Sequence, residues 1–421
     1  MRIEGSVAPG FESVEALFRH NMHTLAEDNA QLCVYVGNSK VVDLWATADS
    51  QRAFDADSLV NVFSSGKSLE SIAIATLVSA GLLDYGAAIT DYWPAFGARG
   101  KGHLTVADLM RHEAGLAAFE VSIDPDHLLP HNIRENRVGE IIENHPPHYR
   151  QGTASKREYH AVTRGWIVNE LFRRVDPKAR TVGEFLREEV SGPLGMDVYV
   201  GLPEDQLGRV VPTAALGAGF YFRESLRPRG RRKVSENFFH LSGKLLRLAP
   251  SLRHRTGRNA APPFLGLDTI SAFNDPRIVM GETPSANAHC SARGLAKLAS
   301  VMASGGSGEQ NTLMSQAAWQ AMHDAPVRSD MGIHTNFTQG GVALFGGGPY
   351  ASVVDRGLNE GREGFYGWMG LGGSLFQWHP EHRIGFAFVP TTLHVIDFLN
   401  ERGKAYQAEV VRCVRALQGP G

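Results

Sequence analysis

The sequence has few cysteines and no excess of either charge. Its three cysteines, Cys33, Cys290 and Cys413, are far apart and odd in number. That pattern argues against a disulfide framework and is compatible with a reducing compartment. The 42 Lys and Arg residues nearly balance the 44 Asp and Glu residues, which gives a formal net charge of −2. The chain as a whole therefore lacks the basic character of a nucleic-acid-binding protein.

Long apolar runs are also missing. The longest, residues 72–83, is interrupted by Thr76, Ser79 and Gly81, and it is too short to span a bilayer. Residues 1–6 lack the apolar core of a signal peptide, so we expect a cytoplasmic protein without a transmembrane segment. With 421 residues, 43% hydrophobic and 20% charged, the chain has the composition of an ordinary globular protein of two or three structural units.

The two ends of the chain carry matching patterns of helices and strands. Apolar periodicity predicts helices at 11–28 and 396–417, and strands at 31–36, 40–46, 374–378 and 384–389. This arrangement predicts an α+β fold in which residues 1–62 and 286–421 form an antiparallel sheet flanked by the terminal helices. Residues 63–285 would be a mostly helical inserted domain.

Residues 63–67 hold the most informative motif. Ser64 and Lys67 are three positions apart at the start of a predicted buried helix, residues 65–80. One helical turn is 3.6 residues, so the two side chains share a face and the lysine can reach the serine hydroxyl. A lysine whose pKa is lowered by burial and by its neighbours can accept the hydroxyl proton, which makes the serine a nucleophile.

The same segment admits a nucleotide-binding alternative. Gly66-Lys67-Ser68 resembles the end of a phosphate-binding loop, whose first glycine would fall at position 61. That position is Asn61, and no strong apolar strand precedes the segment. The nucleophile interpretation is therefore favoured, and the remaining alternative is that Ser64 and Lys67 are unrelated residues of one helix.

Two further segments supply partners that acyl transfer needs. Tyr159 lies on a polar loop before a helix predicted at 162–174, and a tyrosine beside a lysine can act as acid and base because cationic neighbours lower its pKa. Residues 366–374 are dense in glycine just before a strand, which lets backbone approach a ligand closely. Taken alone, Tyr159 is better explained as a packed tyrosine, and a tight turn at a sheet edge would explain the glycine strip equally well.

One segment, residues 223–258, differs in charge from the rest of the chain. It holds eleven Lys or Arg residues against two acids, Glu224 and Glu236. We interpret it first as a solvated insertion held by a few apolar anchors. A lid over the active site and a surface for an anionic membrane or a partner are the alternatives.

Other chemistries find little support in the sequence. It has no Gly-x-Ser-x-Gly, no His-Glu-x-x-His and no Gly-x-Gly-x-x-Gly between a strand and a helix. Five histidines of the helical middle lack the spacing of metal ligands, so we expect no metal and no other cofactor; they are His103, His127, His131, His145 and His148.

Together, the Ser64 element, the Tyr159 loop and the 366–374 strip resemble the serine β-lactamase-related proteins, closest to the family VIII carboxylesterases and the eukaryotic β-lactamase-domain proteins. The similarity continues through residues 41–45, 60–64, 81–85, 92–94, 109–116 and 291–296. It implies a β-lactamase/DD-peptidase-like fold. It also implies that Ser64 is the acylated nucleophile, Lys67 its base, and Tyr159, at the Tyr-x-Asn position, the shared acid and base.

At the sheet edge the resemblance aligns Trp368-Met369-Gly370 with the Lys-Thr-Gly element, so the oxyanion hole would be the N–H groups of Ser64 and Leu371. Trp368 cannot hold the carboxylate of a β-lactam, although a tryptophan here is typical of family VIII esterases, where it offers an apolar wall. Ala161 replaces the asparagine of Tyr-x-Asn. Arg293 is a candidate substitute for the missing anion anchor.

We therefore predict a carboxylesterase-type serine hydrolase that cleaves small uncharged esters through an acyl-enzyme, with weak β-lactam hydrolysis as a side activity. Two alternatives stay open. One is a scaffold or assembly protein with weak or no turnover, and the other is an acyltransferase to a small-molecule acceptor. We expect no nucleic-acid partner, and the sequence does not define an oligomeric state.

Overall fold

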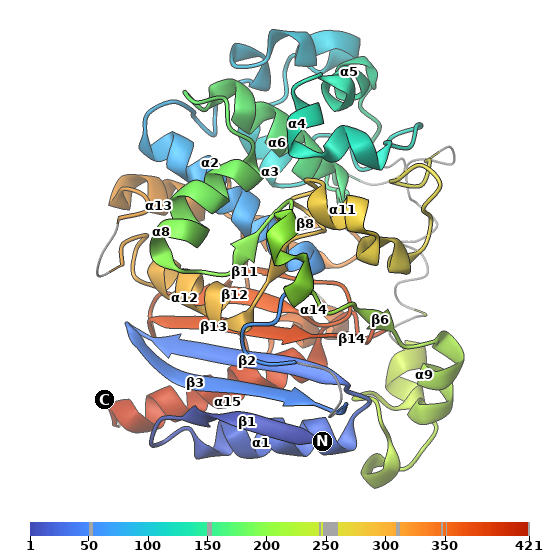
Figure 1. Ribbon diagram of the computed structural model, residues 1–421, viewed down its shortest axis with the longest axis vertical. Coiled ribbons are helices and arrows are strands. Elements are labelled where there is room, and N and C mark those ends of the chain that lie inside the picture. The colour runs from blue at the N-terminus through green and yellow to red at the C-terminus, as the bar shows by residue number, and fades with distance from the viewer. Residues whose placement is uncertain are drawn as a thin grey trace.

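A nine-stranded antiparallel sheet is the centre of the fold in the computed structural model (Figure 1), which describes residues 1–49, 54–149, 154–243, 246, 260–308, 312–346, 348–350 and 352–419. In spatial order the strands are β1 (Arg2–Val7), β3 (Ser39–Thr47), β2 (Asn29–Val36), β13 (Ile384–Pro390), β12 (Leu375–His379), β11 (Tyr366–Met369), β10 (Ala343–Leu344), β9 (His334–Phe337) and β8 (Val327–Asp330). The pairing of β2 with β13, from Val36 opposite Ile384 to Ala30 opposite Pro390, joins the two ends of the chain. The predicted sheet built from both termini is confirmed.

Helices cover both faces of this sheet. Figure 1 shows α1 (Glu12–Thr24) and α15 (Glu401–Gln418) together on one side, and α12 (Ala292–Ala303) on the side facing the helical part. Successive residues of β2 pack against the helices on opposite faces of the sheet, because successive strand residues point to opposite faces. Leu32 packs in the cluster with α1 and α15, whereas Cys33 packs in the cluster with α12. A Cβ at Gly385 would lie 2.3 Å from the backbone nitrogen of Ser300, so glycine permits the close packing of α12 on β13.

The helical part is centred on α2 (Lys67–Ser79), which is buried on nearly every side as predicted. Its other α-helices in the described residues are α3 (Val106–Met110), α4 (Pro130–Ile133), α5 (Arg137–Asn144), α6 (Thr163–Val175), α7 (Val182–Leu186), α8 (Gly192–Leu194), α9 (Ala218–Ser225) and α11 (Pro276–Met280), while α13 (Gln316–His323) and α14 (Val353–Asn359) follow α12. Two small sheets complete the chain: β4 (Val60–Asn61) with β7 (His289–Cys290) and β5 (Val198–Tyr199), and β6 (Ala214–Ala215) with β14 (Thr392–Leu393). The predicted domain division stays a prediction.

Both terminal helices are shorter than expected, and one edge strand was not predicted. The first helix, expected over 11–28, ends at Thr24. The last helix begins at Glu401 rather than 396, because Asn400 adopts a left-handed conformation (φ +52°) and its side chain caps the helix by accepting from the N–H of Gly403. Strand β1 was not predicted. It is an edge strand whose side chains are mostly exposed, so it lacks the apolar alternation that marks a half-buried strand.

Part of the basic segment lies outside the described residues, namely 244, 245 and 247–258. No helix in the described ranges is both long and apolar enough to cross a membrane.

Candidate active site

Ser64 is presented by a short turn between a strand and a helix. Strand β4 ends at Asn61, the 3-10 turn η1 (Phe63–Gly66) follows, and α2 begins at Lys67. Phe63 has a φ of +46°, which is unusual for an aromatic residue and costs about 1–3 kcal/mol. The side-chain oxygen of Asn61 holds this conformation by accepting from the N–H of Phe63 at 2.8 Å. The turn therefore places Ser64 just before the buried helix α2, with its side chain next to that of Lys67.

The Lys67 amine has three polar contacts. Its Nζ lies 3.3 Å from Ser64 Oγ and donates to the carbonyl oxygens of Ala161 (2.6 Å) and Ser285 (2.9 Å). Burial, assisted by the Arg164 guanidinium and opposed by Glu70, holds the pKa of Lys67 well below its usual range. A neutral amine has two N–H donors and one lone pair. The two carbonyls take the donors, so the lone pair is left for the hydroxyl proton of Ser64.

Tyr159 lies beside this pair on the loop that precedes α6. Its ring is 4.9 Å from Lys67 Nζ, and its hydroxyl accepts from Trp368 Nε1 at 2.9 Å. Burial raises the pKa of Tyr159 to about 12, although the side chains of Ser64 and Trp368 partly oppose that rise. A cation, Arg164, does lower this pKa as expected, but burial has the larger effect, so the net direction is upward. The phenol is protonated and can donate.

The glycine-rich strip follows β11 and contacts the Ser64 turn directly. Ser374 Oγ donates to the carbonyl of Val62 at 2.6 Å, and Ser65 Oγ donates to the carbonyl of Ser374 at 3.0 Å. A Cβ at Gly370 would lie 2.3 Å from the Val62 oxygen, so only glycine fits this approach. The turn and the strip are thus tied together by the residues on either side of the nucleophile.

Two backbone donors are free at this junction. In the described part of the chain, the N–H groups of Ser64 and Leu371 have no hydrogen-bond acceptor. Leu371 follows Gly370 and is 38% exposed. Unpaired N–H groups beside a nucleophile are what an oxyanion hole requires.

Trp368 closes the site on the sheet side. It is buried and packs against Phe337 (5.0 Å between ring centroids) and Phe345 (6.3 Å, stacked). Its indole N–H is committed to the Tyr159 hydroxyl. The residue therefore combines the apolar surface expected from the sequence with a donor role toward Tyr159 that the sequence did not indicate.

A buried ion pair beneath Lys67 was missed in the sequence. Glu70 and Arg164 are both fully buried and lie 2.8 Å apart. Arg164 also donates to the carbonyl of Lys67 at 3.0 Å, and Ser285 Oγ donates to Glu70. Ser285 thus contacts Glu70 through its hydroxyl and the Lys67 amine through its carbonyl. The sequence signal for Glu70 was its position one helical turn beyond Lys67, whereas Arg164 lies among the other polar residues of α6 and gave no such signal.

Two neutral histidines support the Tyr159 loop. His112, in a left-handed conformation (φ +64°), accepts from the N–H of His160 through Nδ1 at 3.1 Å and packs 5.0 Å from the Tyr159 ring. His160 Nε2 accepts from the N–H of Leu116 at 3.1 Å. Burial lowers the pKa of His112 well below its usual range and that of His160 to about 4, so both rings are uncharged acceptors.

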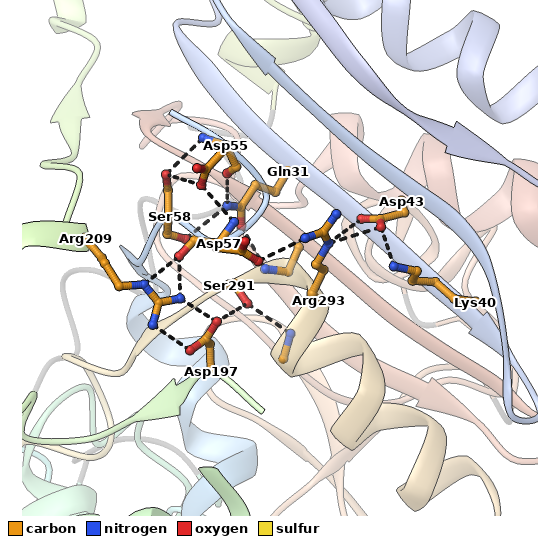
Figure 2. A network of polar contacts seen from close by, with 12 residues as sticks. Gln31, Lys40, Asp43, Asp55, Asp57, Ser58, Asp197, Arg209, Ser291 and Arg293 are labelled. Atoms are coloured by element: carbon orange, nitrogen blue, oxygen red, sulfur yellow. Dashed lines mark hydrogen bonds and ion pairs between the residues drawn. The ribbon is translucent and has the colours of Figure 1, made fainter. Parts of the chain in front are cut away.

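The anion-anchor alternative for Arg293 is wrong. Figure 2 shows its guanidinium held by Asp43 and Asp57 at the junction of the sheet and helical parts. Both ion pairs measure 2.9 Å, so the charge of Arg293 is already compensated.

The turn between β12 and β13 is the group of described residues whose ligand atoms lie close enough together to hold a metal ion. It consists of His379, Glu381 and His382, and it includes none of the five histidines of the helical middle.

Comparisons with known proteins place this chain in one family. The sequence profile of the Beta-lactamase family matches residues 14–409, and the chain belongs to that family. A curated relative, the esterase/beta-lactamase LipL of Mycobacterium tuberculosis, is 29% identical over 404 residues, which are 93% of this chain and 83% of LipL.

Solved structures agree with this assignment. A family VIII carboxylesterase is 26% identical, with a TM-score of 0.73 over 98% of this chain and 100% of its own. A penicillin-binding-protein homologue from Caulobacter crescentus is 25% identical, with the same TM-score and the same coverage. EstA from Arthrobacter nitroguajacolicus, at 23% identity and TM-score 0.73 over the whole of both chains, shares the fold. The predicted family and fold class are confirmed.

Proposed function

We propose that this protein is a serine esterase that hydrolyses small, uncharged carboxylic esters through an acyl-enzyme on Ser64. The observation that carries the proposal is the contact set of Lys67. A buried amine with a lowered pKa has both N–H donors taken by carbonyls and lies 3.3 Å from the serine hydroxyl. That is the arrangement of a general base.

Acylation begins with attack of Ser64 Oγ on the ester carbonyl carbon while Lys67 Nζ takes the hydroxyl proton. The negative charge moves to the carbonyl oxygen, where the N–H groups of Ser64 and Leu371 would stabilise it. Collapse of this intermediate breaks the ester C–O bond. The phenol of Tyr159 gives its proton to the departing alcohol oxygen.

The proton on Lys67 then restores the Tyr159 phenol, and the contacts of Ser64 with both side chains support this transfer. Deacylation reverses the sequence. Water loses a proton to Lys67 and attacks the acyl carbon. Ser64 Oγ leaves with a proton from Tyr159, and the proton on Lys67 restores the phenol.

The substrate class follows from what lines the site. Trp368 and Met369 offer no cation for a substrate carboxylate, and the Trp368 indole N–H is already used by Tyr159. The names of two relatives, a family VIII carboxylesterase and an esterase/beta-lactamase, support ester substrates. β-Lactams would be poor substrates because no charge holds their carboxylate.

The direct test is the hydrolysis of p-nitrophenyl esters of short acyl chains. Ser64→Ala should reduce kcat/KM at least a thousandfold without changing the melting temperature, and retained turnover would overturn the proposal. Ser68→Ala is a matched control. It lies on the same helix, and its buried hydroxyl has no hydrogen-bond partner within the described residues, so its removal should leave both activity and stability intact.

A further inference from the structure

Residues 218–243 form a small lobe at the edge of the molecule, which we call the α9 lobe. Figure 1 shows α9 projecting beside β6 and β14, away from the body of the helical part. Its own small core consists of Tyr221, Val234 and Leu241, all at most 3% exposed. The backbone of Lys233 also accepts from the N–H of Ala26 at 2.8 Å. The lobe is therefore a folded, anchored unit.

Large apolar side chains gather on the outside of this lobe. Phe222, Leu226 and Phe239 are 51%, 58% and 82% exposed. Phe222 and Leu226 share one face of α9 because they are four positions apart. Phe238 bridges the other two phenylalanines, with ring centroids 5.3 Å from Phe222 and 5.8 Å from Phe239. A contiguous exposed apolar patch of this kind marks an interaction site.

The charge that the lobe presents to solvent is positive. Its exposed charged residues are all basic, namely Arg223, Arg227, Arg229, Arg231 and Lys233. Its two acids, Glu224 and Glu236, are only 1% and 4% exposed, and Glu224 pairs with Arg227 at 3.2 Å. Basic residues surrounding exposed phenylalanine and leucine are the combination that binds an anionic lipid interface.

We propose that the α9 lobe docks the protein peripherally on an anionic lipid surface. Phe222, Leu226 and Phe239 enter the boundary between headgroups and acyl chains. The arginines of the 227–231 turn contact headgroup phosphates. A nucleic-acid partner would satisfy the arginines but would leave Leu226 unused.

The lobe is connected to the strip beside Ser64. Leu216, just before α9, donates its N–H to the carbonyl of Leu393 on β14 at 3.0 Å. Leu393 in turn packs so closely on Gly372 that a Cβ there would lie 2.4 Å from it. Docking would therefore hold the strip at residues 370–374 in a fixed orientation to the lipid surface.

Vesicle co-sedimentation of the purified full chain tests the proposal. We expect binding to vesicles of phosphatidylcholine with about 30% phosphatidylglycerol at low salt, weaker binding at high salt, and little binding to pure phosphatidylcholine. Absence of binding to the anionic vesicles at low salt would overturn the proposal. The assay does not use activity, so it is independent of the proposed function.

Two double variants identify the surface. Arg229→Glu with Arg231→Glu should reduce the partition coefficient at least tenfold, since each basic residue contributes near the membrane. Phe222→Ser with Phe239→Ser should reduce it comparably, with an unchanged melting temperature because both side chains are exposed. The control, Arg99→Glu with Arg137→Glu, makes the same charge change at exposed positions of the helical part. Equal loss in the control and the lobe variant, or full binding by both lobe variants, would overturn the assignment.

Discussion

Lys67 Nζ lies 3.3 Å from Ser64 Oγ, and its other two polar contacts are backbone carbonyls. Carbonyl oxygens only accept hydrogen bonds, so they fix which way the amine's hydrogens point. When the amine is neutral, its lone pair is left facing the serine. This geometry gives the lysine the role that histidine plays in other serine hydrolases.

Lys67→Arg tests that role. Guanidinium stays protonated and cannot accept the Ser64 proton, so kcat/KM for a p-nitrophenyl ester should fall about 10²–10⁴-fold. Circular dichroism would check that the fold is retained. Activity within tenfold of the wild type would show that Ser64 is activated by another group.

Glu70→Gln should shift the pH dependence. The Glu70 carboxylate raises the pKa of Lys67, against the larger lowering effect of burial. Its removal should lower that pKa further, so the acid limb of kcat/KM, which reports deprotonation of the free enzyme's base, should move to lower pH. An unmoved limb would mean that Lys67 does not titrate there.

Arg164→Met should shift the pH dependence of kcat/KM in the opposite direction. Arg164 lowers the pKa of Lys67, so its loss should move the acid limb to higher pH. Because Glu70 would be left unpaired in the interior, the variant should also unfold more easily, by about 3–5 kcal/mol. Measuring the profile and the unfolding free energy together separates the electrostatic effect from damage to the fold. A shift to lower pH in a folded variant would contradict the account.

Trp368→Phe tests whether Tyr159 donates a proton to the leaving alcohol. The variant keeps an aromatic ring but loses the N–H that bonds the Tyr159 hydroxyl at 2.9 Å. That bond favours the phenolate, so without it Tyr159 becomes a weaker acid. Alkyl esters, whose alcohols need a proton to leave, should lose about tenfold or more in kcat, whereas p-nitrophenyl esters should lose less. Equal losses for both would argue against proton donation by Tyr159.

Arg293→Ala should change stability without changing chemistry. The pKa of Asp43 is lowered because hydrogen bonds from Arg293 and Lys40 outweigh the effect of burial. A depressed carboxyl pKa contributes stability above the unfolded value, about 3.9, and loses it as pH falls through the folded value. The variant should therefore be less stable by about 1–2 kcal/mol at pH 7, with a smaller difference below about pH 4. Its kcat should stay within twofold, and a large loss would return Arg293 to the site.

The sequence predicted what depends on local spacing. Ser64 and Lys67 meet because they are one helical turn apart, and β2 and β13 follow from short, nearly continuous apolar runs. The contacts between distant segments were harder to predict. Glu70 and Arg164 are 94 positions apart, and nothing in either segment shows that the two charges neutralise each other in the interior. The direction of the Tyr159 pKa depends on burial, which outweighs the opposing effects of Ser64, Trp368 and Arg164, and only the packed site reveals that balance.

The most direct test of lysine activation is the rate at which a fluorophosphonate probe labels Ser64, measured against pH with the modified peptide mapped by mass spectrometry. A single adduct on Ser64 is expected. Its rate should rise with pH to a plateau reached well below the usual lysine range, and in Lys67→Arg the rate should be far lower with no such plateau. Labelling of another residue, or a Ser64 rate that Lys67→Arg leaves unchanged, would contradict the claim that Lys67 activates Ser64.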